Sequence, residues 1–480
     1  MTQSVDERHQ PAAGAVVHPA RNGLVLAILV TCQLMLVLDV TVMNVALPHI
    51  QADLRFSATG LSWVINAYTL IFGGLLLLGG RAGDMFGRRR MFMIGIVVFT
   101  LASLAGGFAT SAGWLLAARV VQGMGAAAAG PSTLALITTT FTEPRARIRA
   151  LAIFSGMSSA GFAVGLIVGG LLTELTSWRA VLFINVPFGV AVVLLAGRFL
   201  SPSVRNAGRL DLPGAVTATL GVGSLVYGFI RAASVGWGDS MTVAAIGLGA
   251  AVLALFVIIE TRAAQPLMPL RLFANRDRAA AYLNYFLGPM AMMSMFFFLT
   301  QFLQLIRGLS PLATGFAFLP MAVALFGMTR LIPILLPRFG PKPLAATGAA
   351  IMIGGLVWLT MLTPDSGYTG SLFGPLVLMG IGAGLGFSPM NIIVMSTVAP
   401  QDAGAAGGVM QTMQNLGATF GLAVLVTVFG TASRQATVTG AAPRVALVHG
   451  MTVAWSVGLV FAAASFLVAL TFRRRAVPTG

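Results

Sequence analysis

Residues 61–90 read LSWVINAYTLIFGGLLLLGGRAGDMFGRRR, which is a run of twenty uncharged residues followed by a short basic loop. A transmembrane helix needs about 20 consecutive apolar residues, because each residue rises about 1.5 Å through a hydrocarbon layer about 30 Å thick. Two further runs, 24–38 and 91–118, also contain no charged residue. Runs of this length predict a polytopic membrane protein built only from α-helices.

The composition of the 480-residue chain agrees with this prediction. Only 9% of its residues are charged and 57% are hydrophobic, whereas a soluble domain carries roughly 25% charged residues. The net charge of +16 would suggest a nucleic-acid partner in a soluble protein, but here the basic residues lie in short loops beside apolar runs, where they set membrane orientation. The single cysteine, Cys32, cannot form an intrachain disulfide and is expected to be a small core residue. These features exclude a soluble enzyme, a secreted disulfide scaffold and a disordered protein, and we expect no nucleic-acid partner.

Charged and Pro/Gly-rich breaks divide the chain into fourteen predicted helices. If the amino terminus is inside, the inner segments carry 21 of the 29 basic residues and the outer segments carry 6, as the positive-inside rule predicts for cytoplasmic loops. The apolar run after the polar residues 1–22 lacks a cleavage site, so we expect it to be retained, with both termini in the cytoplasm. The use of 28 Arg against one Lys suggests a GC-rich bacterial genome, and hence the bacterial cytoplasmic membrane. The predicted helices are 23–48, 60–80, 91–111, 113–139, 149–173, 179–200, 212–232, 241–260, 279–304, 312–337, 344–362, 370–397, 405–430 and 447–471.

The inner loops after the second and tenth predicted helices resemble each other. Residues 84–89 read DMFGRR and residues 337–342 read PRFGPK, so Phe-Gly and a basic residue two positions later recur. The two loops are equivalent if two six-helix halves flank an inserted helix pair, and paired halves are typical of transporters. We therefore predict a tail at 1–22, a six-helix bundle at 23–205, a two-helix insertion at 206–262, a second six-helix bundle at 263–472 and a tail at 473–480.

Three charged residues lie well inside predicted helices, away from the helix ends. At that depth charge is costly and marks a functional candidate. Asp39 lies in the outer half of the first helix, and Arg119 of the fourth helix lies at a similar depth, so the two side chains can pair. Such a pair can couple to protons, or it can simply hold two helices together. Arg330 lies about 12 Å from the inner surface without an evident acidic partner, which leaves a cavity-lining role and a contact with backbone carbonyls open. The other twelve acidic residues, Glu174 and Glu260 included, lie at helix ends, in loops or in tails.

Glycines and polar residues at fixed offsets mark three further segments. The loop 80–90 contains glycines and an aspartate that an orientation signal does not need; the aspartate can pair with a basic group or cap a helix start. The segment 119–125 places a glutamine one turn after an arginine, and glycines in the fifth helix form a face suited to close packing. The candidate residues are Gly80, Asp84, Gly87, Arg88 and Arg89 in the loop, Gln122, Gly123 and Gly125 in the fourth helix, and Gly161, Gly165, Gly169 and Gly170 in the fifth.

Five segments together resemble the major facilitator superfamily, and more narrowly its fourteen-helix drug/proton antiporter family of multidrug and antibiotic efflux pumps. The first three are residues 38–48 (LDVTVMNVALP), the loop 80–90 and the segment 119–125. Residues 177–187 (SWRAVLFINVP) and 297–304 (FFLTQFLQ) fit the same family. The resemblance covers residues 24 to about 470 and implies the major facilitator fold, with two six-helix bundles and two inserted helices.

The resemblance implies proton-coupled export of an amphipathic small molecule, such as a drug or antibiotic, with the proton gradient as energy source and no cofactor. Asp39 and Arg119 would carry the coupling, because burial disfavours an ionised carboxylate and a nearby arginine favours it. Asp84 and Arg88 would hold the two halves together when the cavity faces outward. We expect the protein to be a monomer in the lipid bilayer.

The chain departs from the family pattern at two positions. Met85 stands where the family usually has a basic residue after the aspartate, and Leu166 stands where it usually has a proline after Gly165. The glycine–proline motif is associated with antiporters, so its absence bears on the direction of transport and leaves the fold untouched.

Other function classes lack their sequence signals. Uptake or facilitated transport of a metabolite on the same fold stays open, and a channel would be recognised by single-channel currents. An intramembrane enzyme would need a set such as His-Glu-x-x-His or a Ser/His pair at depth, whereas the four histidines lie in the tail or near outer helix ends. We therefore predict no enzyme and no metal site. The chain also has no Gly-x-x-x-x-Gly-Lys-Ser/Thr loop, so ATP should not drive it directly.

Residues that contact the substrate are the least marked by the sequence. Flexible methionines and aromatic rings crowd the ninth and thirteenth helices and suit a tolerant cavity, although most such residues in a bundle are core or lipid-facing. The candidates are Asn44, Tyr68, Gln301, Gln304, Arg330, Met410, Gln411, Gln414 and Asn415.

Overall fold

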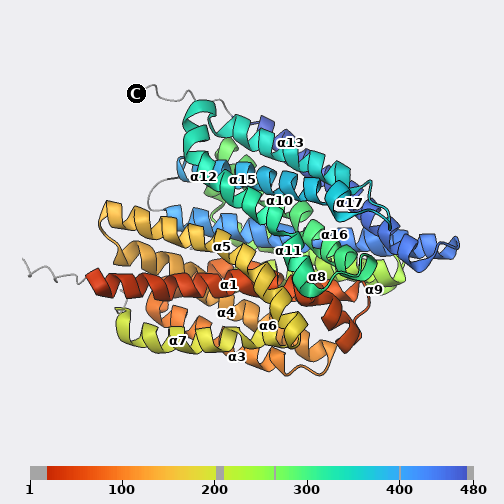
Figure 1. The fold of residues 1–480 in the computed structure, drawn as a ribbon. Helices are drawn as coiled ribbons and strands as arrows, with labels where there is room; N and C mark the ends of the chain where they lie inside the picture. Colours follow the sequence, from red (N-terminus) through yellow and green to blue (C-terminus); the bar gives the residue numbers. More distant parts are fainter. Residues whose placement is uncertain (1–18, 202–209, 264–265, 399–401, 473–480) are drawn as a thin grey trace, which may run out of the picture.

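The chain folds into a bundle of membrane-spanning helices. The computed structural model describes residues 19–201, 210–263, 266–398 and 402–472, and within these ranges every regular element is a helix. Fourteen stretches are long and apolar enough to cross a membrane, which confirms the all-α class and the predicted number of spans. An even number of crossings brings the start of the first helix and the end of the last to one side of the molecule, which we call the inner side (Figure 1).

The helices follow one another with short connections. The first six spans consist of α1 (Pro19–Leu54), η1 (Gly60–Ser62) with α2 (Trp63–Phe86), α3 (Arg88–Gly107), α4 (Ala112–Thr140), α5 (Pro144–Leu175), and α6 (Ala180–Phe183) with α7 (Asn185–Phe199). The next two are α8 (Leu212–Val235) and α9 (Ser240–Arg262), and η2 (Leu270–Phe273) follows them. The last six are α10 (Arg276–Gln301) with η3 (Phe302–Ile306), α11 (Pro311–Ala317) with α12 (Leu319–Phe339), α13 (Pro341–Leu359), α15 (Phe373–Met395) after the short α14 (Tyr368–Ser371), α16 (Ala403–Val438), and α17 (Pro443–Leu470).

The helices pack as two groups with a hairpin beside them. In the first half α4 packs against α2 and α3, and α1 packs against α5. In the second half α10 packs against α16 and α17, while α15 packs against α12 and α13. Figure 1 shows the first half, coloured red to yellow, below the second half, coloured green to blue. The hairpin of α8 and α9 lies against α2 and α16, one helix from each half.

Five pairs of these helices join the two halves, namely α1 with α10 and α11, α2 with α16, and α5 with α11 and α12. We call the contacts of α1 with α10, α2 with α16, and α5 with α11 the three seams. In the first seam, the Thr300 hydroxyl donates to Asn44 Oδ1 at 2.6 Å. In the second seam, the hydroxyl oxygens of Thr69 and Thr419 lie 2.7 Å apart. The first two seams therefore contain buried polar contacts. In the third seam, the backbones of α5 and α11 approach each other closely at glycines.

The observed helix ends differ from the predicted ones mainly by being longer. The first helix continues past Pro48 to Leu54, and α16 continues to Val438 instead of ending near 430. Hydropathy falls once a helix leaves the hydrocarbon layer, but its backbone hydrogen bonding continues there. A helix end predicted from hydropathy therefore lies before the observed end of the helix. Two spans are broken, at Ile184 between α6 and α7 and at Phe318 between α11 and α12.

The two similar inner loops share a backbone conformation. Gly87 ends α2 with φ of 99°, and Gly340 ends α12 with φ of 74°. Glycine adopts such positive φ values without strain, whereas a side chain would oppose them. The repeated Phe-Gly therefore marks the same kind of helix stop in both halves.

Candidate functional site

A buried ion pair lies inside the first half. Arg119 Nη1 of α4 donates to Asp39 Oδ2 of α1 at 2.5 Å, and both residues are 1% exposed. Asp39 lies slightly beyond the middle of α1 towards its outer end, and Arg119 lies in the second turn of α4, which starts on the outer side. The pair that the sequence allowed is therefore present, and its role stays a prediction.

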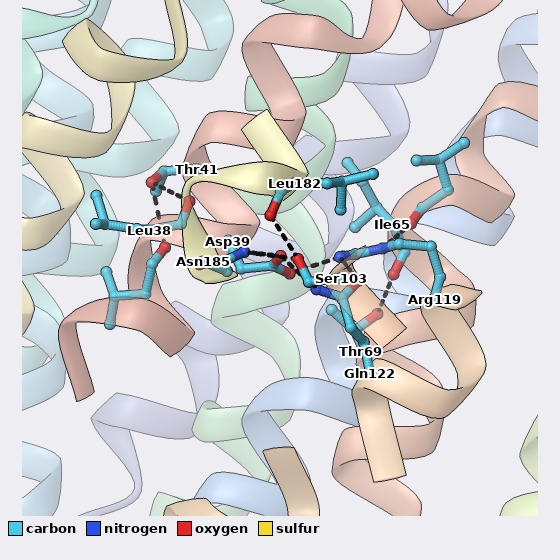
Figure 2. A network of polar contacts seen from close by, with 12 residues as sticks. Leu38, Asp39, Thr41, Ile65, Thr69, Ser103, Arg119, Gln122, Leu182 and Asn185 are labelled. Carbon is cyan, nitrogen blue, oxygen red and sulfur yellow. Dashed lines mark hydrogen bonds and ion pairs between the residues drawn. The ribbon is translucent and has the colours of Figure 1, made fainter. Parts of the chain in front are cut away.

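The other oxygen of Asp39 accepts hydrogen bonds from two amides. Gln122 Nε2 donates to Asp39 Oδ1 at 2.8 Å, and Asn185 Nδ2 donates to the same oxygen at 3.2 Å (Figure 2). Both amides also donate to Ser103 Oγ, at 3.2 and 3.1 Å, and this hydroxyl donates to the carbonyl oxygen of Leu182 at 2.8 Å. Helices α1, α3, α4 and α7 thus meet at one carboxylate. An ionised carboxylate only accepts hydrogen bonds, and every neighbour here is a donor.

Arg119 is also fixed by α2. Its Nε donates to the carbonyl oxygen of Val64 at 3.0 Å, and its Nη1 donates to Gln122 Oε1 at 2.9 Å. The guanidinium carbon lies 4.4 Å from the centre of the Tyr68 ring, which is a cation–π distance. Arg119 and Gln122 are three residues apart and therefore project from the same face of α4. The sequence motif thus places a charge and an amide together at Asp39.

The two motif glycines allow α4 to approach its neighbours. A Cβ at Gly123 would lie 2.8 Å from the carbonyl oxygen of Tyr68 in α2. A Cβ at Gly125 would lie 2.6 Å from the backbone nitrogen of Phe99 in α3. Any larger residue would push α4 away, so these glycines position Arg119 and Gln122.

The network can exchange one positive partner of Asp39 for another. A buried charge needs a counter-charge, so Asp39 can lose Arg119 only if a proton or another cation replaces it. The described residues contain no group of three or more His, Cys, Asp or Glu that could hold a metal ion. Exchange of the positive partner of Asp39 is a step that this arrangement allows, and it would form no covalent bond.

Two residues of this network were not predicted as site residues. Asn185 lies in the quoted stretch 177–187, and its position before a proline in an apolar run was the available signal. Ser103 lies in the uncharged run 91–118 and resembles an ordinary helix-packing residue. Only the packing of α3 against α4 and α7 reveals its contact.

The sequence matches the family model of the Major Facilitator Superfamily over residues 29–422. The chain belongs to this superfamily. It is therefore a multi-pass membrane transporter of a small-molecule substrate and not an enzyme. The loop 80–90, the segment 119–125 and the Asp39–Arg119 pair are accordingly parts of a major facilitator transporter.

Two relatives match the transporter over most of its length. The cephamycin export protein CmcT of Amycolatopsis lactamdurans is 44% identical, over 86% of this chain and 85% of that protein. The puromycin resistance protein pur8 of Streptomyces alboniger is 43% identical, over 89% and 87%. A solved bacterial homologue of the human lysosomal transporter Spinster, in an inward-facing and occupied conformation, has the same fold, with a TM-score of 0.64 at 18% identity over 94% of this chain and 97% of that one.

The glycines in α5 of this transporter serve two interfaces. A Cβ at Gly161, Gly165 or Gly169 would lie 2.8 Å or less from an atom of α1. A Cβ at Gly170 would lie 2.6 Å from Cα of Leu312 in α11, which belongs to the second half. The predicted small-residue face therefore packs α5 within its own half, and its last member packs across the seam.

The unusual Leu166 lies at this same seam. Its side chain is buried, and its carbonyl oxygen lies 2.3 Å from the position of a Cβ on Gly315 of α11. The backbones of α5 and α11 are therefore in direct contact beside the position where the family usually has a proline. Glycine at 315 is required by this contact.

The predicted gating loop ties helices of the first half together. Arg88 donates from Nε to Asp84 Oδ1 at 3.0 Å, and Arg89 Nη2 donates to the carbonyl oxygen of Gly197 in α7. Gly80 lies against α4, where a Cβ would be 3.5 Å from the nearest atom. The Asp84–Arg88 pair thus connects the end of α2 with the start of α3, and its contact with the second half stays a prediction for another conformation.

Several predicted substrate residues lie at the seams. Asn44 accepts from Thr300 as described above, and Gln304 Nε2 donates to the carbonyl oxygen of Val45 at 2.8 Å. Asn415 lies on α16 against Gly73 of α2, with its Cβ 2.7 Å from the position of a glycine Cβ. These side chains therefore lie at contacts between the two halves.

The remaining substrate candidates are spread over other surfaces. Tyr68 belongs to the Asp39 network, and Gln301 donates to the carbonyl oxygen of Phe297 in its own helix at 3.2 Å. Arg330 is exposed on α12, with its guanidinium carbon 4.9 Å from the centre of the Phe326 ring. On α16, Met410 is buried, Gln414 is half-buried and Gln411 is exposed.

Proposed function

We propose that this transporter exports an amphipathic drug-like molecule across the bacterial cytoplasmic membrane in exchange for protons. Its inner side, with both chain termini, faces the cytoplasm, and the protein acts as a monomer. Relatives that are 43% and 44% identical are a puromycin resistance protein and a cephamycin export protein. The excess of basic residues on inner segments supports the orientation.

The observation that carries the proposal is the fully buried Asp39, paired with Arg119 and accepting from two amides. In one state Arg119 balances the carboxylate, and in the other state a proton does. A cationic substrate can compete for the same carboxylate, which gives exchange without a chemical step. For an uncharged substrate, each proton that enters down 100 mV supplies about 2.3 kcal/mol, enough for a substrate gradient of roughly fifty-fold. A one-for-one exchange with a cationic substrate moves no net charge and draws on the pH gradient alone.

The test is Asp39→Asn in proteoliposomes, because asparagine keeps size and hydrogen bonding but cannot ionise. In this variant Arg119 keeps the carbonyl oxygen of Val64, Gln122 Oε1 and the Tyr68 ring as partners. We therefore expect normal insertion, preserved downhill exchange and no uphill export when a pH step is imposed. Asp365→Asn, in an exposed loop, is the matched control and should behave as wild type. An Asp39→Asn transporter that still concentrates substrate after the pH step would exclude Asp39 as the coupling site.

The alternative is proton-coupled uptake or facilitated transport of a metabolite on the same fold. Leu166 stands where the proline associated with antiporters is usual, and this difference supports the alternative function. A drug-susceptibility panel in a pump-deleted host separates the two directions. Export predicts increased resistance to at least one compound, whereas uptake predicts unchanged or increased sensitivity.

A further inference from the structure

A pair of acidic residues is buried at the inner end of the inserted hairpin. Asp211 caps the start of α8, and Glu260 lies in the last turn of α9. They are 8% and 3% exposed, so more than nine-tenths of each residue is covered. Carboxylates at a helix end normally face water, and this burial requires a reason.

Each carboxyl group uses one oxygen to hold the backbone. Asp211 Oδ1 accepts from the Gly214 amide at 2.8 Å, and Glu260 Oε2 accepts from the Met268 amide at 3.1 Å. The second oxygens, Asp211 Oδ2 and Glu260 Oε1, are buried and accept no hydrogen bond from a donor in the described chain. Two buried oxygens are therefore left to interact with each other.

The two oxygens converge over Gly214. A Cβ on this glycine would lie 2.5 Å from Asp211 Oδ2 and 2.9 Å from Glu260 Oε1, so only glycine leaves the space that they occupy. The side chains of Asp211 and Glu260 are within hydrogen-bonding reach of each other. A hydrogen bond between two carboxyl groups requires one proton, because ionised carboxylates have no donor.

Among the residues that the structure describes, no cation on the surrounding elements bonds to either second oxygen. Arg271 of η2 pairs with Asp402 at 2.8 Å, and Arg278 of α10 donates to backbone carbonyl oxygens. Within the described ranges, no charged residue on the packed elements donates to either second oxygen. The charged residues at the inner end of these elements are Arg81 and Asp84 on α2, Arg262 on α9, Arg271 on η2, Arg276, Asp277 and Arg278 on α10, and Asp402 before α16.

We propose that Asp211 and Glu260 bind one shared proton and form a protonation site separate from Asp39. One residue is the carboxylic acid and donates to the carboxylate of the other, so the pair carries a single negative charge. Without the proton, two like charges face each other in a buried site and repel. The start of α8 then separates from the end of α9, and the Met268 amide is released.

Proton occupancy thereby controls how the hairpin is attached to the second half. Met268 precedes η2 and α10, so its bond to Glu260 ties the connecting segment to the end of α9. The hairpin also lies against α2 and α16, at one of the seams between the halves. A change of inner pH is therefore transmitted to a seam that must move during transport.

Infrared spectroscopy of the purified transporter in lipid nanodiscs tests the shared proton. At pH 5 we expect wild type to show a carboxylic-acid C=O band that is lost in both Glu260→Gln and Asp211→Asn. Each amide keeps shape and hydrogen bonding, and asparagine remains a good helix cap, so the variants should fold. Asp365→Asn is the exposed control and should keep the band. A band that survives unchanged in both pair variants overturns the proposal.

Hydrogen exchange at Met268 tests the consequence. Raising the pH from 6 to 9 should cause a loss of protection at this amide in wild type, beyond the change seen in Glu260→Gln. Equal pH dependence in the two proteins would contradict the coupling. A metal cation in place of the proton would be recognised by a chelator, or by replacement of sodium with choline, lowering the unfolding temperature of wild type alone; that result would also overturn the proposal.

Discussion

The two halves of the transporter have related helices but different interiors. In the first half, the interior of the bundle contains Asp39, Arg119 and the amides that surround them. The equivalent stretch of α10, counted back from Gly340 as Asp39 is from Gly87, is residues 289–295, which read PMAMMSM without a charge. The second half instead buries aromatic rings, with Phe298 lying 5.1 Å from Phe429 and 6.5 Å from Trp455 between ring centres.

The two inner loops also differ in charge. The first-half loop carries Asp84, paired with Arg88, while the second-half loop has Pro337 at the matching position. Both loops keep the same glycine stop, so the fold needs the glycine and not the carboxylate. The difference teaches that the buried ion pair belongs to the first half, whereas the second half has an apolar interior around Phe298, which we call the apolar frame.

The largest expected effect comes from removing the positive partner in the first half. Arg119→Met leaves Asp39 buried without a counter-charge, which costs about 3–5 kcal/mol when one member of a buried pair is lost. We expect low membrane abundance and a lower unfolding temperature of the purified protein. The double variant Asp39→Asn/Arg119→Met should recover most of the abundance. If Arg119→Met is as stable as wild type, the first half does not depend on its buried charges, and the proposed difference between the halves is wrong.

The second effect concerns the loop carboxylate. Asp84→Asn removes the charge that pairs with Arg88, and we expect it to shift the balance between the two transport states without unfolding the protein. Transport should be mostly lost while membrane abundance and substrate binding stay normal. Transport assays and binding titrations on the same preparation measure this. If abundance falls in proportion to transport, the loop has a structural role only.

The third effect is in the apolar frame of the second half. Phe298 is fully buried, so Phe298→Ala should reduce the free energy of unfolding by about 3 kcal/mol through lost packing and a cavity. The pH dependence of the remaining transport should be unchanged, since no titrating group is touched. Phe316→Ala, on an exposed ring of α11, is the matched control and should be nearly neutral. An altered pH dependence in Phe298→Ala would assign coupling to both halves.

The sequence was sufficient for the features that depend on local signals. Fourteen helices follow from the length of uncharged runs, and the Asp39–Arg119 pair follows from charge at matching depth. The contacts of Ser103 and Asn185 depend on which helices pack side by side, and a single sequence does not contain that information. The sequence indicates an ordinary helix-end residue at Glu260, because Asp211, which converges with it over Gly214, lies at the start of a different helix.

The smallest expected effect lies in the inserted hairpin, which belongs to neither half. Its Asp239 serves as a reference for the effect of a carboxylate outside the two bundles. Asp239 caps α9, accepting from the Thr242 amide at 3.0 Å, and pairs with Arg231 at 2.7 Å. The hydrogen bond from Arg231 lowers the pKa of Asp239 from 3.8 to about 2. The carboxylate is therefore more stable in the folded protein, so its contribution is complete above pH 3.8 and is lost as the pH falls towards 2. Asp239→Asn keeps a capping side chain, so its unfolding temperature at pH 7 should be only slightly below wild type, and the difference should shrink between pH 4 and pH 2.5. Thermal unfolding at these three pH values measures this, and a difference that stays constant would mean that the cap geometry, and not the charge, stabilises the hairpin.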